Sequence, residues 1–401
     1  MFLKEGINLK NVGKRKRCIL ALEGLLTFKR AVLVPTDDES RLLLAEKYGI
    51  VSVVPLDMIL GIDRLPFKIS VYMMLNIAKQ AINARSYKSL EDKFKEEYNI
   101  KLSNDTIKLV VDELGGIVFN YDNLMKEDAL QRLKNGVLRP VPRHARFGVL
   151  YIEMDGSMFN TCDSINGSTW REIKLGLVYS TVTPNFYNDF SDLDREYISY
   201  IGDADTFKAH LFAVAERSGL YRASKIIVIG DGAKWIKGFV DTYCNGLDVQ
   251  YILDMSHMKS NIFKFSESVI RGKRKQNIWA NTVLQLLLKG KIDEALTMTE
   301  PFKDIKREGI PNLYNYISNN RNNIDYAAYI EAGYFVGSGK IESANRHVVQ
   351  ERIKRPGMRW TISSAQKLMS LKCKYDSGLW DKLVVPLVFA HYNIKPATID
   401  Y

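Results

Sequence analysis

The feature that most constrains the fold is a series of apolar segments that lead into acidic residues. Gly148–Asp155 (GVLYIEMD) ends in Asp155, and Lys225–Gly230 (KIIVIG) is followed directly by Asp231. Two more strands are expected at Glu172–Ser180 and Val249–Leu253, and a helix at Thr206–Ser218. Apolar strands that alternate with a helical pattern predict an α/β fold with a mainly buried sheet.

Two of these acids share a chemical context. Asp155 precedes Gly156, and Asp231 precedes Gly232. Open α/β sheets place their sites at strand ends, and a glycine allows a ligand to approach the backbone closely. Asp followed by Gly is also ordinary turn chemistry, so each pair alone has a purely structural interpretation.

A third acid, Glu342, follows Gly337-Ser-Gly339. Ser338 can cap a helix that runs through Gln350, which puts Glu342 in its first turn. Helix N-termini favour acidic residues anyway, so this position alone does not define a site. The cations that follow suggest a phosphate nearby, although a solvated basic helix explains them too. They are Arg346, Arg352, Lys354, Arg355 and Arg359.

The charge balance favours a polyanionic partner. The 401 residues include 57 Lys and Arg against 46 Asp and Glu, a formal net charge of +11. Lysines and arginines placed on phosphates release counterions, which makes nucleic acid a natural partner; a solvated basic surface is the alternative. The four cysteines form no CxxC pair and are too few for a disulfide framework.

The same composition predicts a cytoplasmic protein. Lys14-Arg-Lys-Arg17 is followed by only five apolar residues before Glu23, too short a run for a signal peptide. No stretch of about 18 apolar residues is present.

The chain divides into segments of different pattern. Residues 61–125 are helical, with Leu90 and Phe94 on one expected helix and Ser103 as the N-cap of the next. Two helices joined by a tight turn predict a helix-turn-helix, with Thr106 and Lys108 as DNA contacts, although many helical hairpins share this pattern. The expected domains are a small β-rich region (1–60), the helix-turn-helix region (61–125), a basic linker (126–147), an α/β core (148–257 and 331–360), a helical insertion (258–330) and a C-terminal helical tail (361–401).

Four motifs together carry a resemblance to a known family. They are MDGS (154–157), GDGAKWI (230–236), LDMSH (253–257) and GSGKIESANRHVVQERIKRPGMRW (337–360). In this order the chain resembles bacterial insertion-sequence transposases of the DDE class, of the ISLre and ISKra type, which are relatives of the mutator-like group. The resemblance covers about residues 148–385. It implies an RNase H-like mixed sheet flanked by helices, with an all-helical insertion.

The resemblance also implies the roles of the acids. The first Asp of the family lies on the first strand, the second follows the fourth strand, and the Glu lies on a late helix after the insertion. These positions correspond to Asp155, Asp231 and Glu342, which would be catalytic and hold two Mg²⁺ ions, with Mn²⁺ as a substitute. Such ions are hard and prefer oxygen ligands.

A histidine is the fourth catalytic candidate. Asp254-Met-Ser-His257 matches a Cys or Asp, two residues, then His, found in mutator-like relatives. His257 could contact a phosphate or position DNA at the metals. A histidine that is simply hydrogen-bonded at a helix start is the alternative.

The implied function is DNA transposition, by phosphodiester hydrolysis and then strand transfer at the ends of the protein's own element. Its partners would be double-stranded DNA and further copies of the chain, as a homodimer or higher oligomer. Trp360 could stack on a base or pack in the core. Further DNA contacts are expected from the basic stretch of Arg271, Lys273, Arg274 and Lys275.

Two other functions remain open at this point. A metal-dependent nuclease or resolvase would use the same acids without strand transfer, and only its products would distinguish it. A domesticated, non-catalytic DNA-binding protein would have no need for the three carboxylates.

Overall fold

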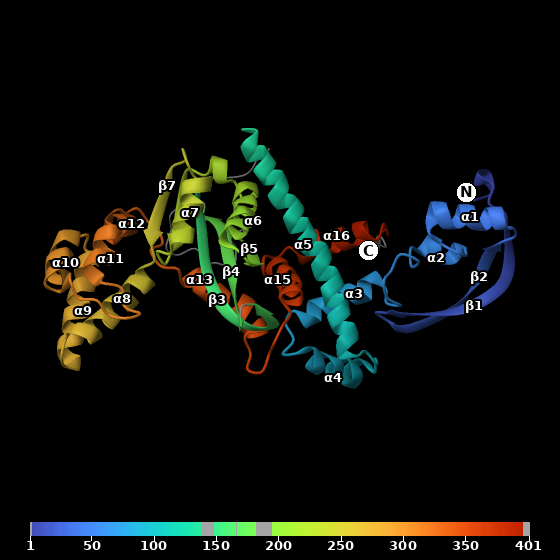
Figure 1. The fold of residues 1–401 in the computed structure, drawn as a ribbon, viewed down its shortest axis with the longest axis horizontal. Helices are drawn as coiled ribbons and strands as arrows, with labels where there is room; N and C mark the ends of the chain where they lie inside the picture. Colours follow the sequence, from blue (N-terminus) through green and yellow to red (C-terminus); the bar gives the residue numbers. More distant parts are fainter. Residues whose placement is uncertain (1, 138–147, 166, 182–194, 396–401) are drawn as a thin grey trace. The chain divides into compact units, whose positions relative to one another are not determined.

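A computed structural model describes residues 2–137, 148–165, 167–181 and 195–395. The chain folds into two compact units (Figure 1). The first comprises residues 1–118 and 378–401, and the second comprises residues 119–377. Each unit is described by itself below.

The first unit begins with a β-hairpin, which lies within the predicted β-rich region of residues 1–60. Its strands are β1 (Leu9–Ala21) and β2 (Gly24–Pro35), paired antiparallel. Helices α1 and α2 follow, and the side chain of Asp57 on α2 binds the hairpin through Arg17 and Arg30. The helices span Asp38–Tyr48 (α1) and Pro55–Leu60 (α2), after a short 3₁₀ turn at Phe2–Glu5.

The rest of the first unit is helical. Ser86 caps α4 through a capping box with Ser89, and Ser103 accepts a hydrogen bond from the backbone N–H of Thr106 at 3.2 Å. These helices are α3 (Val71–Ala81), α4 (Tyr87–Tyr98), the first half of α5 (Asn104–Lys134) and, from the C-terminal segment, a π-helical turn (Trp380–Val384) and α16 (Val385–His391).

The structure differs from two predictions about this region. Two helices joined by residues 99–103 are present, but α5 is a single helix of 31 residues, far longer than the short second helix expected for a helix-turn-helix. The expected linker is also partly helical, since α5 continues to Lys134; residues 138–147 of that linker lie outside the described residues. Buried apolar residues recur along α5 from residues 107–118 to Ala129, which is fully buried. Burial of this apolar face stabilises the longer helix.

The second unit contains a five-stranded mixed sheet with strand order β5-β4-β3-β6-β7. Strands β3, β4 and β5 pair antiparallel, whereas β6 and β7 run parallel to β3. β6 and β7 lie where the sequence predicted them, and β5 was missed. The strands are β3 (Val149–Ile165), β4 (Ser168–Thr181), β5 (Arg195–Ile201), β6 (Lys225–Gly230) and β7 (Val249–Leu253).

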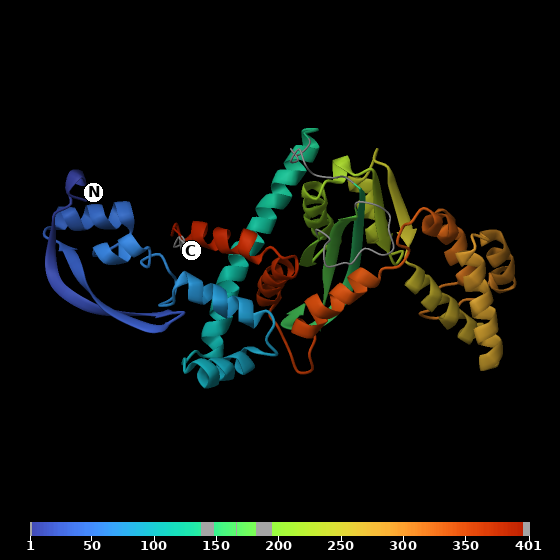
Figure 2. The same cartoon turned by 180° about the vertical axis from the view of Figure 1, so that it is seen from behind.

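Helices cover both faces of this sheet (Figures 1 and 2). On one face, α6 and α7 bury Leu150, Ile152 and Met154 of β3 in the main hydrophobic core. On the other face, α13 contacts β3 and β4, and α15 packs on β5. The helices are α6 (Ala204–Arg217), α7 (Lys234–Tyr243), α13 (Gly339–Ala344), a π-helical segment (Asn345–Gln350), α14 (Glu351–Ile353) and α15 (Ile362–Asp376), with a 3₁₀ turn at Leu220–Arg222.

Helices follow β7 in the segment for which the sequence predicted a helical insertion. Its core includes Phe265, whose ring lies next to those of Trp279 and Phe302. Its helices are α8 (Met255–Val269), α9 (Lys273–Leu288), α10 (Ile292–Thr299), α11 (Leu313–Asn319) and α12 (Tyr326–Glu331), with 3₁₀ turns at Glu300–Phe302 and Arg321–Asn323.

Strand β3 differs from its prediction in length. It continues ten residues past Asp155, so this acid lies within the strand and not at its end. The continuation is stabilised by pairing with β4, where Phe159 lies opposite Arg171, and Phe159 is almost fully buried. Within the described parts of the chain, no helix is long and apolar enough to cross a membrane.

A buried histidine makes the second unit sensitive to acid. His210 on α6 is 2% exposed and lies beside the rings of Phe119 and Tyr200. Burial lowers the pKa of His210 to about 3 from its ordinary 6.5, and the charges of nearby lysines add to the effect. Below pH 6.5 the unfolded chain therefore binds a proton at this histidine, whereas the folded chain does not. The free energy of unfolding consequently falls as the pH decreases from 6.5 towards 3.

We expect His210→Phe to make unfolding less dependent on pH in this window. Relative to the variant, the wild type should lose about 2 kcal/mol of its free energy of unfolding between pH 7 and pH 5, at about 1.4 kcal/mol per pH unit below 6.5. Urea denaturation at both pH values measures this difference. Parallel losses in the two proteins would contradict the assignment.

Candidate functional site

Helix α13 carries Glu342 in its first turn, as the sequence predicted. The helix is anchored to the sheet at Ile341, whose backbone N–H donates to the Glu153 carboxylate on β3 at 3.0 Å. Ser338, at the N-cap, donates its hydroxyl to Oε1 of Glu342 at 3.2 Å and so orients that side chain. The Glu342 side chain is exposed, so a metal ion or a substrate can reach it.

Glu153 is the buried acid that makes this anchor possible. It is fully buried, and it also accepts a hydrogen bond from the Tyr179 hydroxyl at 2.6 Å. Burial raises the pKa of Glu153 to about 7, against the opposing effects of the Tyr179 hydrogen bond and the nearby charge of Lys340. A carboxylate at this depth is stabilised only because its partners replace the lost water.

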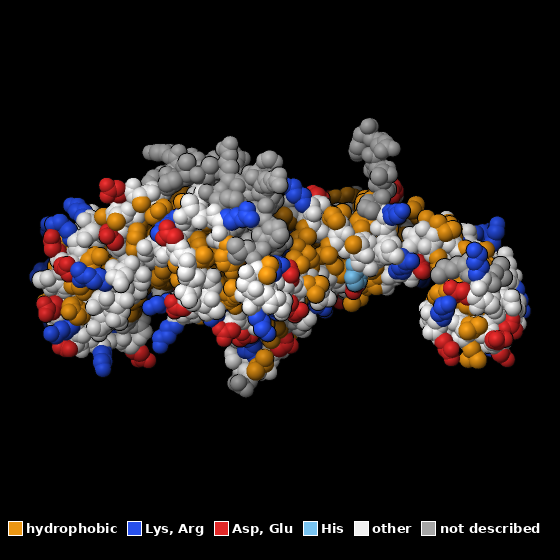
Figure 3. Space-filling view, turned by 90° about the horizontal axis from the view of Figure 1, so that it is seen from above, with side chains coloured by type: hydrophobic (Ala, Val, Ile, Leu, Met, Phe, Trp, Pro, Cys, Tyr) orange, Lys and Arg blue, Asp and Glu red, His pale blue; other side chains and the backbone are white. Residues whose placement is uncertain are grey.

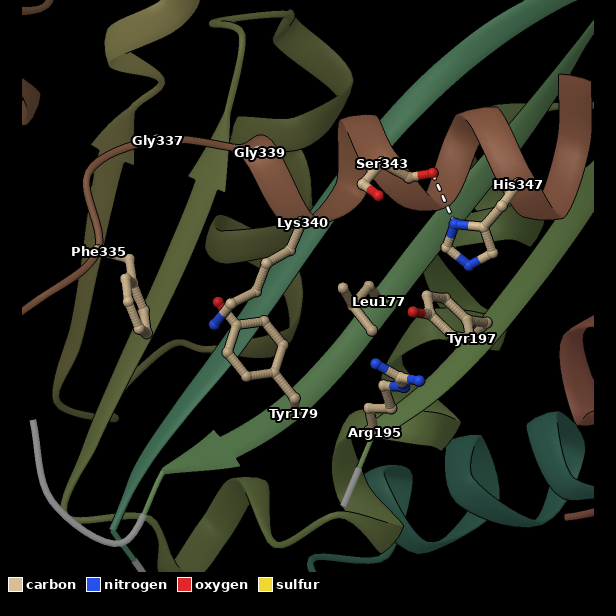
Figure 4. Close-up of a pocket in the computed structure, with 10 residues that line it drawn as sticks. All are labelled: Leu177, Tyr179, Arg195, Tyr197, Phe335, Gly337, Gly339, Lys340, Ser343 and His347. Atoms are coloured by element: carbon tan, nitrogen blue, oxygen red, sulfur yellow. Dashed lines mark hydrogen bonds between the residues drawn. The ribbon is translucent and has the colours of Figure 1, made fainter. Parts of the chain in front are cut away.

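Lys340 lies beside Glu153 within an aromatic cage. Its ammonium nitrogen is 3.7 Å from the ring centroids of both Tyr179 and Phe335, where cation–π attraction stabilises a partly buried charge. Burial lowers the pKa of Lys340 to about 7, and the charge of Glu153 opposes this shift. Figure 4 shows this cage at one end of a pocket of 430 Å³ between α13 and the sheet.

Asp155 is held by the same helix one turn further on. Its Oδ2 accepts a hydrogen bond from the side-chain amide of Asn345 at 2.6 Å, and its Oδ1 accepts from the backbone of Gly156 at 2.7 Å. Asn345 is the first residue of the π-helical segment. Such widened turns are rare and often occur at functional sites, and this one brings the amide next to Asp155.

Asp231 lies directly after β6, where the sequence placed it. Its Oδ1 accepts from the backbone N–H of Ala233 at 2.8 Å, and its carbonyl accepts from the Tyr316 hydroxyl at 3.1 Å. The next residue must be a glycine. Gly232 has φ +91°, and a Cβ there would come within 3.0 Å of Leu253.

Asp254 and His257 form a hydrogen-bonded pair at the start of α8. Asp254 is fully buried, and its Oδ2 binds both the backbone N–H and the Nδ1 of His257, at 3.0 and 2.8 Å. Its Oδ1 accepts backbone N–H groups from Ser256 and Ser338. Although burial raises the pKa of Asp254, these hydrogen bonds outweigh it and hold the pKa below its ordinary value.

Asp254 and Glu342 come close to His257. Ligand atoms of Asp254, His257 and Glu342 lie within 4.8 Å of one another, a group that could hold a metal ion. Asp155 and Asp231 belong to no such group among the described residues, but their charges act on the ring. The hydrogen bond to Asp254 raises the pKa of His257, and the charges of Asp231 and Asp155 add to this rise.

The four hydrogen bonds that Asp254 accepts determine its role in the site. Both of its oxygens are already occupied by donors, and it has no exposed surface. Its role is to fix the ring of His257, in the way that outer carboxylates orient histidines at metal sites. This leaves Nε2 as the ring nitrogen that can face a ligand, because Nδ1 is bound to Asp254.

The predicted basic residues after Glu342 fall into two groups. Arg352 is 2% exposed and stacks on Trp360, with 4.9 Å from its guanidinium carbon to the ring centroid. Trp360 is 8% exposed, so both side chains pack in the fold here, and their contact with DNA stays a prediction. Lys354 is exposed and donates to Ser157 on β3 at 2.9 Å. The other exposed or half-buried cations of this group are Arg346, Arg355 and Arg359.

The other predicted DNA contacts lie far along the chain from these acids. The basic stretch at the start of α9 is exposed, and Lys273 pairs with Glu267 at 2.6 Å. In the view of Figure 3, basic and acidic side chains alternate over the helical insertion. Lys108 on α5 pairs with Asp112, and Thr106 is half-buried at the start of the same helix. Exposed members of the stretch are Arg271, Lys273, Arg274 and Lys275.

Sequence analysis missed four residues that shape this site. Glu153 and Lys340 position α13, Asn345 binds Asp155, and Asp254 orients His257. Asp254 was visible as part of a motif, and an acid inside an apolar strand such as β3 is itself an unusual signal. Nothing in the spacing alone pairs Asn345 with Asp155.

These observations define an α/β protein with an acidic site beside a mixed sheet. Carboxylate oxygens from separate elements, together with one imidazole, form a group that could hold a metal ion.

Comparison with known proteins places the chain in a family. The model of the uncharacterised protein family UPF0236 matches residues 10–384, so the chain belongs to that family. No curated protein matches the sequence.

Replacing Glu153 should release α13 from the sheet. We expect Glu153→Ala to lower the free energy of unfolding by about 3–5 kcal/mol, because it removes two buried charge-assisted hydrogen bonds and leaves the Lys340 charge without its neighbour. Glu351→Gln is the matched control, since Glu351 is exposed and only 3.9 Å from Arg346; it should cost less than about 1 kcal/mol. Urea denaturation measures both, and similar small effects would contradict the anchor.

Proposed function

We propose that this protein is a DDE-type DNA transposase with an RNase H-like core. The single observation that carries the proposal is the meeting of Glu342 with Asp254 and His257, at an imidazole that also feels the charges of Asp155 and Asp231, although 76 and 111 residues separate the three predicted acids in sequence. A metal-dependent phosphoryl-transfer site requires carboxylates from distant parts of the chain close to one exposed point.

The positions of the acids support the resemblance to transposases. Asp155 lies on β3, which is the first strand of the five-stranded sheet, and Asp231 follows β6, its fourth strand. Glu342 lies on a late helix that follows the helical insertion. This order is the one that the resemblance implies for the catalytic acids.

The donor set fits divalent metal ions. Asp155, Asp231 and Glu342 would hold two Mg²⁺ ions, and Mn²⁺ could replace them. When bound, such a pair activates an attacking oxygen and stabilises the leaving oxygen of a phosphodiester. Asn345 fixes the orientation of Asp155, and Ser338 that of Glu342.

His257 and the basic side chains would bind the substrate. The Nε2 of His257 can donate to a DNA phosphate, because Asp254 holds the ring through Nδ1. Lys354, which contacts β3 beside Asp155, is placed to bind a phosphate of the strand that enters the site. Transposition also requires two element ends in one complex, so we propose that the protein acts on double-stranded DNA as a homodimer or higher oligomer.

The test is cleavage of supercoiled plasmid in Mg²⁺ or Mn²⁺. We expect the wild type to nick the plasmid, and Asp231→Asn to reduce the rate by at least about 100-fold, since loss of outer partners of metal ligands alone costs about 10–100-fold. Asp241→Asn makes the same chemical change on the exposed surface of α7 and should leave the rate unchanged.

The products separate the remaining possibilities. Joining of a labelled 3′-hydroxyl end to target DNA supports transposition, whereas nicking without joining identifies a nuclease or resolvase. Binding of DNA without cleavage by either protein would indicate a non-catalytic binding protein. Equal cleavage by the wild type and by Asp231→Asn would refute the assignment of the second carboxylate.

A further inference from the structure

The β-hairpin of the first unit is basic throughout. Strands β1 and β2 together hold seven Lys and Arg residues and contain no Asp or Glu. In two successive cross-strand pairs, cations lie directly opposite each other: Arg15 opposite Arg30, and Lys16 opposite Lys29. Like charges in such positions destabilise a hairpin, so this arrangement favours a role beyond folding.

On one face of the hairpin, two arginines are neutralised within the protein. Arg17 and Arg30 both bind Oδ2 of Asp57 at 2.8 Å, and Arg17 also donates to the carbonyl of Ile62. The Asp57 side chain is only 3% exposed. This face is therefore fixed against α2, and two of its three arginines are occupied; the third, Arg15, is exposed.

The opposite face carries lysines that point away from α2. Side chains alternate along a strand, so Lys14 and Lys16 lie on the face opposite Arg17, together with Lys29 across from Lys16. All three lysines are exposed. Within the described parts of the chain, none of the three forms an ion pair.

We propose that this outer face, formed by Lys14, Lys16 and Lys29, binds the phosphate backbone of double-stranded DNA. A two-stranded antiparallel ribbon fits the major groove of B-form DNA, which is about 12 Å wide. The major groove of A-form RNA is too narrow to admit protein elements in this way, which favours DNA. The inference shares its partner with the proposed function, but it concerns a surface separate from the acidic site.

An anionic membrane is the main competing partner, since Leu22, Leu25 and Leu26 at the hairpin turn are exposed. The lysines lie in the middle of the hairpin, however, whereas these leucines and Glu23 lie at or next to the turn. Charge and apolar surface are therefore separated along the hairpin, which favours a phosphate backbone as the partner of the lysines.

The experiment is binding of the full-length protein to a fluorescent 30-base-pair duplex in EDTA, where cleavage cannot occur. The variant K14Q/K16Q/K29Q should bind at least about tenfold more weakly in moderate salt. The slope of log K against log salt should fall by about two to three, at about 0.9 for each lost phosphate contact. The control K4Q/K95Q/K101Q removes three exposed lysines of the same unit, with the same change in net charge. It should retain the affinity and the salt dependence of the wild type.

Each result is decisive for the hairpin. Unchanged binding by the hairpin variant, or an equal loss in both triple variants, would overturn the proposal. The proposal would also be overturned if the hairpin variant lost binding to phosphatidylserine vesicles but kept its affinity for DNA. That result would identify membranes as the partner of this surface. Thermal unfolding checks the fold, and the hairpin variant should melt no lower than the wild type because like charges have been removed. Failure of plasmid nicking would leave this binding result intact.

Discussion

The attachment of helix α13 to strand β3 is the interaction on which the rest of the site depends. Two acids on the same face of β3 bind the helix at two points that are one helical turn apart. Glu153 binds the backbone of Ile341, and Asp155 binds the side chain of Asn345. Because side chains two residues apart share one face of a strand, a single strand can hold a helix in both position and rotation. Glu342 lies between these two contacts and is thereby aimed at His257.

The two acids of β3 have the same chemistry and opposite roles. Glu153 is removed from water and surrounded by Tyr179, Lys340 and a backbone N–H, so its charge serves the fold. Asp155 remains partly exposed, and its charge reaches His257 together with those of Asp231 and Asp254. Negative charges that accumulate around one imidazole repel one another, and a bound cation would stabilise them.

The parts of the fold that the sequence predicted best are those with local signals. Continuous apolar runs gave β6 and β7 with correct ends, and the Asp-Gly step after β6 located Asp231. The Gly-Ser-Gly sequence before Glu342 also correctly predicted that this residue lies in the first turn of a helix. The features that the sequence did not predict depend on partners far away in sequence. The extension of β3 past Asp155 requires β4, and the pairing of Asn345 with Asp155 requires a π-helical turn that has no known sequence pattern. The burial of Arg352 against Trp360 likewise depends on tertiary packing.

The central claim is that Asp155, Asp231 and Glu342 together hold divalent metal ions. Anomalous scattering from crystals soaked in Mn²⁺ tests it most directly, because it locates the ions independently of any activity. The account predicts peaks bound by the carboxylates of all three residues, about 4 Å apart if two ions bind. A peak held by Asp254 and His257 without Asp155 and Asp231, or no peak near these carboxylates, would contradict it.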